Sequence, residues 1–182
     1  TIRDVARRSQ LDNEIAHLPV KKYHCMPTVL GNILSAAERY PEIRYVLDAM
    51  VCWPRLYPLL SDTLRDDIAF ARDNLNQSTR LMAWGILFLV WIIWQWWALL
   101  GLVVAWLGYR GMIIAAGVYG DLIRTAFDIH RFDLYKSLNW PLPNEPENER
   151  MMGKKLTEYL FRGIAPPDLK FAYEKENGNE MS

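Results

Sequence analysis

Cysteine and histidine are scarce in this chain of 182 residues, which has two cysteines and three histidines. Cys25 and Cys52 are too few for a disulfide framework and lack the paired spacing of a zinc site. Nucleophilic catalysis needs a base beside its nucleophile, and His17, His24 and His130 lie in no local catalytic signature. A glycine-rich phosphate loop is also missing. The sequence therefore predicts a non-enzymatic protein with no cofactor and no metal site.

An excess of charge of either sign is missing too, because 21 Lys and Arg side chains balance 21 Asp and Glu side chains. The regions before residue 81 and after residue 119 are each close to neutral. Nucleic-acid binding requires a clustered positive potential. We therefore expect no nucleic-acid partner.

The most informative absence is that of charge from residue 81 to residue 109, where Gln95 is the single strongly polar side chain. About 20 such residues are enough to cross the hydrocarbon core of a bilayer. A helix of this length in the core of a soluble protein would carry a polar stripe. The sequence therefore predicts an integral membrane protein whose first partner is the lipid bilayer.

The apolar segment, which we place at 81–119, is predicted to form a transmembrane hairpin with its turn near 95–97. Gln95 lies within a cluster of tryptophans, and tryptophan prefers the headgroup level of a bilayer. The first arm, about 80–94, is then short and thins the bilayer locally. A hairpin places both polar flanks on one side, and basic residues near membrane ends favour the cytoplasm. We expect the plasma (inner) membrane, with both flanks cytoplasmic.

Small residues recur at steps of three and four along the second arm, where they would allow two helix backbones to approach closely. This face either receives the first arm of the same hairpin or contacts another subunit. Arg110 either snorkels to the membrane surface or lines a pore. The candidate assembly or gating residues are Gly101, Ala105, Gly108, Arg110 and Ala115.

The distribution of proline organises the flanks, because all ten prolines lie outside residues 59–140. Residues 1–60 are predicted to form short helices, one of them at 28–40 and ended by Pro41, followed by pieces at 42–50 and 54–60. Ser61 is a good N-cap for a stalk helix, 61–80, that runs on into the membrane. Its apolar seam faces either the rest of the chain or a second copy, and consists of Leu64, Ile68, Ala71, Leu75, Ser78 and Met82.

After the membrane, residues 120–165 are predicted to form cytoplasmic helices, the first at 121–139 and the last following Pro146. Asp121, Arg124, Asp128 and Arg131 recur at steps of three and four, where opposite charges can pair along a helix face. Residues 166–182 have the composition of an extended or disordered tail.

Four charged side chains occur in a short region rich in aromatic residues and proline, namely Glu38, Arg44, Asp48 and Arg55. Two charges of each sign predict a structural salt-bridge network that holds the short helices against the stalk. A pocket for a small polar ligand is the alternative.

Two blocks of sequence, at 26–60 and 119–128, resemble a group of prokaryotic multi-helix membrane proteins. The first contains MPTVLGNIL, AAE, YP, RY, LD and WPRLYPLL, and the second reads YGDLIRTAFD. Together they bracket roughly half of the chain, on both sides of the apolar segment. It implies a longer parent protein with further membrane helices upstream and a membrane hairpin between the blocks. It implies no reaction. Similar proteins tend to carry glycine where this chain has Val46.

The sequence as a whole predicts an all-α integral membrane protein, with a transmembrane helical hairpin and a cytoplasmic helical region formed by both flanks. We expect it to act as a structural or assembly subunit of a homo-oligomer or of a larger membrane complex. A signal-gated effector or pore-forming subunit is the alternative. A cofactor-holding accessory subunit of an energy-converting complex is a weaker one, suggested by the tryptophans and His130.

Overall fold

The computed structural model describes residues 26–167 and residue 169, and this part of the chain is helical without strands. Its fold is therefore all-α, as the sequence predicts. The helices are α2 (Val29–Tyr45), α3 (Ala49–Leu56), α4 (Asp62–Phe88), α5 (Leu100–Ser137) and α6 (Pro146–Arg162), with short 3₁₀ turns η2 (Tyr57–Leu59), η3 (Leu89–Ile93) and η4 (Trp96–Leu99). The expectations for residues 1–25 lie outside the described residues, and so do His17, His24 and Cys25. Most of the predicted tail also lies outside them.

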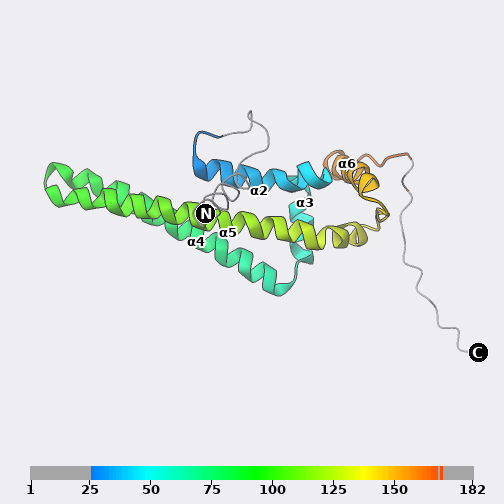
Figure 1. The fold of residues 1–182 in the computed structure, drawn as a ribbon, viewed down its shortest axis with the longest axis horizontal. Coiled ribbons are helices and arrows are strands. Elements are labelled where there is room, and N and C mark those ends of the chain that lie inside the picture. Colours follow the sequence, from blue (N-terminus) through cyan, green and yellow to red (C-terminus); the bar gives the residue numbers. More distant parts are fainter. Residues whose placement is uncertain (1–25, 168, 170–182) are drawn as a thin grey trace, which may run out of the picture.

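The longest feature is a hairpin of α4 and α5, which pack side by side and project well beyond the other helices (Figure 1). Ser61 caps α4, because its side chain accepts a hydrogen bond from the backbone N–H of Leu64. The chain reverses between η3 and η4, where Gln95 has extended backbone. The apolar segment is therefore two packed arms rather than one straight helix.

The apolar seam of α4 faces α5 of the same chain. Leu64, Ile68 and Ala71 are buried, and Leu75, Ser78 and Met82 are half-buried. Of the two alternatives left open by the sequence, this arrangement is the contact with the protein's own helices.

Helix α5 runs without a break through residues 119–121, so the expected second arm and the expected helix at 121–139 are one helix of 38 residues. Nothing in that stretch interrupts the backbone hydrogen bonds, because glycine weakens a helix without ending it. Gly120 instead allows α2 to approach, since a Cβ at this position would lie 3.1 Å from the Cβ of Ala37.

Helix α2 does not end at Pro41, contrary to the prediction, but continues to Tyr45. Proline in a helix interior costs about 3 kcal/mol because it lacks an N–H and crowds the preceding turn. Pro41 is among the fully buried side chains, so its packing offsets part of that cost. The predicted pieces at 42–50 and 54–60 are therefore replaced by the end of α2 and by α3, which contains Pro54.

The hydrophobic core lies at the end of the hairpin away from its turn, where α2, α3 and α6 cover α5 (Figure 1). Its fully buried members include Leu47, Cys52, Leu56, Phe127, Leu134, Tyr135 and Leu156. The molecule thus has two parts, a helical domain with its own core and a projecting hairpin.

Candidate functional site

The projecting end of the hairpin, residues 81–109, is covered with exposed apolar side chains; we call it the apolar tip. Trp94 is 84% exposed and Trp96 is 78% exposed. Monomeric soluble proteins rarely expose contiguous apolar surface on this scale. The other large exposed side chains of the tip are Leu81, Trp84, Ile86, Leu87, Phe88, Val90, Trp91, Trp97, Leu99, Leu100, Leu102, Val103, Trp106 and Leu107.

Glycines allow the two arms of the tip to touch backbone to backbone. A Cβ at Gly85 would lie 2.5 Å from the backbone nitrogen of Ala105, and one at Gly108 would lie 2.5 Å from that of Met82. A Cβ at Gly101 would meet the carbonyl oxygen of Gly85 at 2.6 Å. The face of small residues therefore receives the first arm of the same hairpin.

The remaining small residues of α5 do not share this contact equally. Ala115 is half-buried, and a Cβ at Gly117 would have no neighbour within 4 Å among the described residues. Gly85 was missed by sequence reasoning, although a signal for it exists, because it continues the seam of α4 three residues after Met82.

The two arms run antiparallel, and their register places residues of the same type at the same height along the hairpin. Met82 lies opposite Gly108 and Ser78 lies opposite Gly111. Arg80 is therefore level with Arg110, and Trp84 is level with Trp106. Arg110 is exposed, and its guanidinium lies 5.7 Å from the centroid of the Trp106 ring. The tip thus begins with an arginine and a tryptophan on each arm.

Within the described part of the chain, one helical stretch, Trp96–Ser137, is long and apolar enough to cross a membrane. Only 22% of its most apolar window is buried within the protein. Its two halves differ in what surrounds them. In the half that belongs to the apolar tip, the apolar side chains that face away from α4 are exposed. Further along, Met112, Ala116 and Ile123 are buried.

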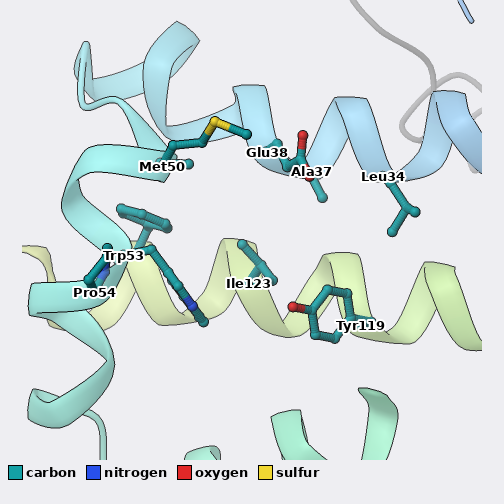
Figure 2. A pocket seen from close by; sticks show the side chains of 10 residues that line it. Leu34, Ala37, Glu38, Met50, Trp53, Pro54, Tyr119 and Ile123 are labelled. Carbon is teal, nitrogen blue, oxygen red and sulfur yellow. The ribbon is translucent and has the colours of Figure 1, made fainter. Parts of the chain in front are cut away.

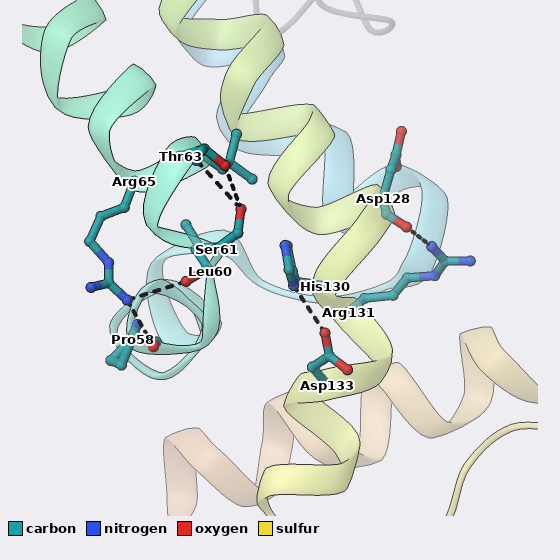
Figure 3. Close-up of polar contacts among 10 residues, drawn as sticks. Pro58, Leu60, Ser61, Thr63, Arg65, Asp128, His130, Arg131 and Asp133 are labelled. Carbon is teal, nitrogen blue, oxygen red and sulfur yellow. Dashed lines mark hydrogen bonds and ion pairs between the residues drawn. The ribbon is translucent and has the colours of Figure 1, made fainter.

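A cluster of polar side chains ties the domain to the hairpin. The Tyr40 hydroxyl donates to one carboxylate oxygen of Asp128 at 3.0 Å, and the Tyr45 hydroxyl donates to the other at 2.6 Å. Arg131 donates to the Asp128 carbonyl (Figure 3) and pairs with Glu149 of α6 at 2.6 Å. Burial and the bond to Asp128 raise the pKa of the Tyr45 hydroxyl, which is therefore a neutral donor at physiological pH.

The four charged residues predicted to form a salt-bridge network have separate roles. Arg44 donates to the Tyr40 hydroxyl at 2.5 Å and stacks on the rings of Tyr40 and Tyr45. Asp48 caps α3 by accepting from the N–H groups of Met50 and Val51. Arg55 donates to the Val51 carbonyl at 2.7 Å.

Glu38, the fourth member, is exposed at the edge of a cavity. The structure does not join these four side chains by ion pairs. Two of them form hydrogen bonds with the backbone of their own helix, and one contacts the two tyrosines. Between helices, Arg131 of α5 instead pairs with Glu149 of α6, whereas Asp121 and Arg124 pair along α5 itself. Asp121, Arg124 and Arg131 belong to the charged series on α5, but Glu149 is distant in sequence.

The cavity beside Glu38 has a volume of about 250 Å³ and lies between α2, α3 and α5 (Figure 2). Apart from Glu38, the hydroxyl of Tyr119 and the indole N–H of Trp53, the side chains that line it are apolar. This lining does not suit the small polar ligand that the sequence left as an alternative. Its other wall residues are Leu34, Ala37, Ala49, Met50, Trp53, Pro54, Ile123 and Phe127.

The turn between α2 and α3 is held by α6. Val46 has left-handed backbone, with φ 57°, which a β-branched side chain rarely adopts. The Thr157 hydroxyl accepts from the N–H of Asp48 at 3.2 Å and lies 3.3 Å from the Val46 carbonyl, to which it donates. Gly153 packs directly on the carbonyl of Tyr45, where a Cβ would not fit. The surrounding contacts therefore fix a backbone conformation that a glycine would adopt without strain.

His130 lies 2.9 Å from the Asp133 carboxylate, measured from Nδ1, and both belong to α5 (Figure 3). Within residues 26–167, no group of three His, Cys, Asp or Glu side chains is placed to hold a metal ion. Cys52 is fully buried, and burial raises the pKa of its thiol to about 12. A thiol held in that state is a poor nucleophile.

Comparisons with protein-family models, with curated proteins and with solved structures give no match to this chain.

Proposed function

We propose that this chain is a non-enzymatic membrane protein whose apolar tip is embedded in a lipid bilayer and holds the helical domain at one membrane surface. The observation that carries the proposal is the exposure of large apolar side chains around both arms of residues 81–107. Burying one such side chain is worth about 1.5–3 kcal/mol. Summed over the tip, the free energy lost by leaving these side chains in water far exceeds the net stability of a typical folded domain.

Arginine supports the orientation in this proposal. Arg80 and Arg110 stand at one level, at the start of the tip, where their side chains can reach headgroup phosphates. Below them, α4 exposes Arg72, Asp73 and Asn76, which belong in water. The domain then rests on the same face as these residues, which we assign to the cytoplasmic face of the inner membrane.

Assembly is the role that we propose for the anchored domain, as a subunit of a homo-oligomer or of a larger membrane complex. The domain exposes apolar side chains away from the tip, among them Phe161, which is 75% exposed, and Ile164, which is 69% exposed. Phe161 lies in the last turn of α6, and Ile164 follows the end of that helix. Mass measurement after purification in mild detergent separates a homo-oligomer from a subunit that copurifies with unlike chains.

The membrane proposal is tested by alkaline extraction of membranes that contain the full chain and two matched variants. Leu102 in the tip and Ile129 in the domain both lie on α5, and they are 55% and 60% exposed. Arginine in the middle of a bilayer costs about 2.5–3.5 kcal/mol on insertion scales. We expect Leu102→Arg to lower the membrane fraction and Ile129→Arg to leave it unchanged. A wild-type chain that stays folded and monodisperse in the supernatant would contradict the proposal.

A gated effector is the second candidate, and the continuity of α4 supports it. This helix runs from the Ser61 cap, inside the domain, to Phe88 in the tip without a break. A rigid-body tilt of the domain would therefore move the tip directly. Arg110 is exposed beside Trp106. Conductance in planar bilayers that Arg110→Ala leaves unchanged would argue against a pore-lining arginine.

A further inference from the structure

The dimensions of the apolar tip indicate which bilayers it fits, an inference that rests on the proposed membrane insertion. Gln95 lies fifteen positions after Arg80 on one arm and fifteen positions before Arg110 on the other. At 1.5 Å per α-helical residue and 2.0 Å per 3₁₀ residue, each arm is about 22–25 Å long. A typical hydrocarbon core is about 30 Å thick.

The turn itself cannot remain among lipid tails. Gln95 is exposed with extended backbone, and no side chain caps the first N–H groups of η4. Exposed irregular backbone does not occur within the hydrocarbon region, because each unpaired group costs several kcal/mol there. Trp94, Trp96 and Trp97 around the turn are also exposed, and tryptophan prefers the headgroup level. The turn therefore belongs at the far surface of the bilayer.

The near end of the tip is equally fixed. Trp84 and Trp106 form a second aromatic level beside Arg80 and Arg110. The tip cannot slide deeper to lengthen its span. The next turns of α4 expose Asp73, Asn76 and Gln77, and these polar side chains would then enter the hydrocarbon.

We propose that the hairpin crosses the whole bilayer and is matched to a thin one, with a hydrocarbon core of about 22–25 Å, so that it selects thin membranes or thins thicker ones around itself. Arg80 and Arg110 at one end of the tip and Gln95 at the other set this length. The partner is thus a bilayer of short acyl chains rather than a particular headgroup.

Flotation of the purified full chain with preformed phosphatidylcholine vesicles tests this proposal. The vesicles carry monounsaturated chains of fourteen, eighteen or twenty-two carbons. Mismatch costs a fraction of a kcal/mol per ångström, so we expect about tenfold stronger binding to the thinnest than to the thickest bilayer. Equal binding to all three, or a preference for the thickest, would overturn the thickness match while leaving membrane insertion intact. An absence of binding to every vesicle would instead remove the proposed function and this inference together.

Cysteine labelling tests the crossing separately. With Cys25→Ser, Cys52 remains as the single native thiol, and it is fully buried. A maleimide that cannot cross membranes, trapped inside the vesicles, should label Gln95→Cys. The control Asn76→Cys, on the exposed polar part of α4, should react only with reagent added outside. If Gln95→Cys is shielded from both sides, the turn lies within the hydrocarbon and the crossing is disproved.

Discussion

The hydroxyl of Tyr45 donates a hydrogen bond of 2.6 Å to the carboxylate of Asp128, which lies 83 positions further along the chain. Tyr45 is the last residue of α2, and Asp128 lies on α5 beyond the part that forms the tip. Tyr40 occupies the other oxygen of the same carboxylate. These bonds fix α2 to the hairpin, so that this helix and the tip can move as one body.

Removing the Tyr45 hydroxyl should therefore destabilise the protein. A hydrogen bond to a charged group contributes about 1.5–3 kcal/mol, and Tyr45→Phe leaves the Asp128 carboxylate with one fewer donor. We expect the free energy of unfolding in detergent to fall by about that amount. The matched control is Tyr135→Phe, because the Tyr135 hydroxyl is buried with no partner in the described part of the chain. This control should be neutral or slightly stabilising, and equal losses in both variants would contradict the assignment.

Stability should fall in alkaline solution. Burial is the largest cause that raises the pKa values of the Tyr40, Tyr45 and Tyr135 hydroxyls above their usual value. A raised pKa in the folded state gives stability that is complete below the unfolded value of about 10 and is lost as the pH rises through the folded value. We expect melting temperatures measured from about pH 8 upward to decrease above about pH 10. Tyr45→Phe should make that decrease shallower, and an unchanged slope would show that Tyr45 is not one of the groups involved.

Val46 is a position at which glycine should improve the protein. Left-handed backbone costs a non-glycine residue about 1–2 kcal/mol, and Val46 has φ 57°. We expect Val46→Gly to raise the free energy of unfolding by up to about 1 kcal/mol, after the loss of a half-buried side chain. Val51→Gly, in the regular helix α3, should lower it by about 0.5–1 kcal/mol. Destabilisation by both substitutions would show that Val46 is not strained.

The close contact between the backbones of α4 and α5 should tolerate no added side chain. Gly85→Leu would force the backbones of α4 and α5 apart, since even a Cβ there lies 2.5 Å from the Ala105 nitrogen. We expect a loss of folded protein in detergent, seen as a lower melting temperature. Gly117→Leu, on α5 with open space around its Cβ, should be neutral or stabilising because leucine favours helix more than glycine. Similar melting temperatures for the two variants would contradict the close contact of α4 with α5 at Gly85.

Periodic features explain why the sequence indicates the fold class and the seam of α4. Steps of three and four along one helix report its buried face directly, and the seam extends to Gly85. Pro41 was misleading because tertiary burial outweighed a local preference. The continuity of α5 was missed because a change from apolar to charged residues alters the surroundings of a helix without breaking it.

The polar contacts were less predictable from the sequence. Asp128 and Arg131 belong to a charged series on α5, where neighbours one turn apart suggest pairing along the helix. Their partners are instead Tyr40, Tyr45 and Glu149, which lie on other helices. Pairing across helices depends on the packing of α2 and α6, and a local charge pattern carries no record of it.

The most direct test of the account uses the tryptophans themselves. Six of the eight lie in the apolar tip, and the other two, Trp53 and Trp140, pack in the domain. With the protein in vesicles whose acyl chains are brominated close to the headgroups, we predict that most of the tryptophan emission is quenched. Emission that bromine leaves intact and iodide removes would place the tip in water, and the account would then be wrong.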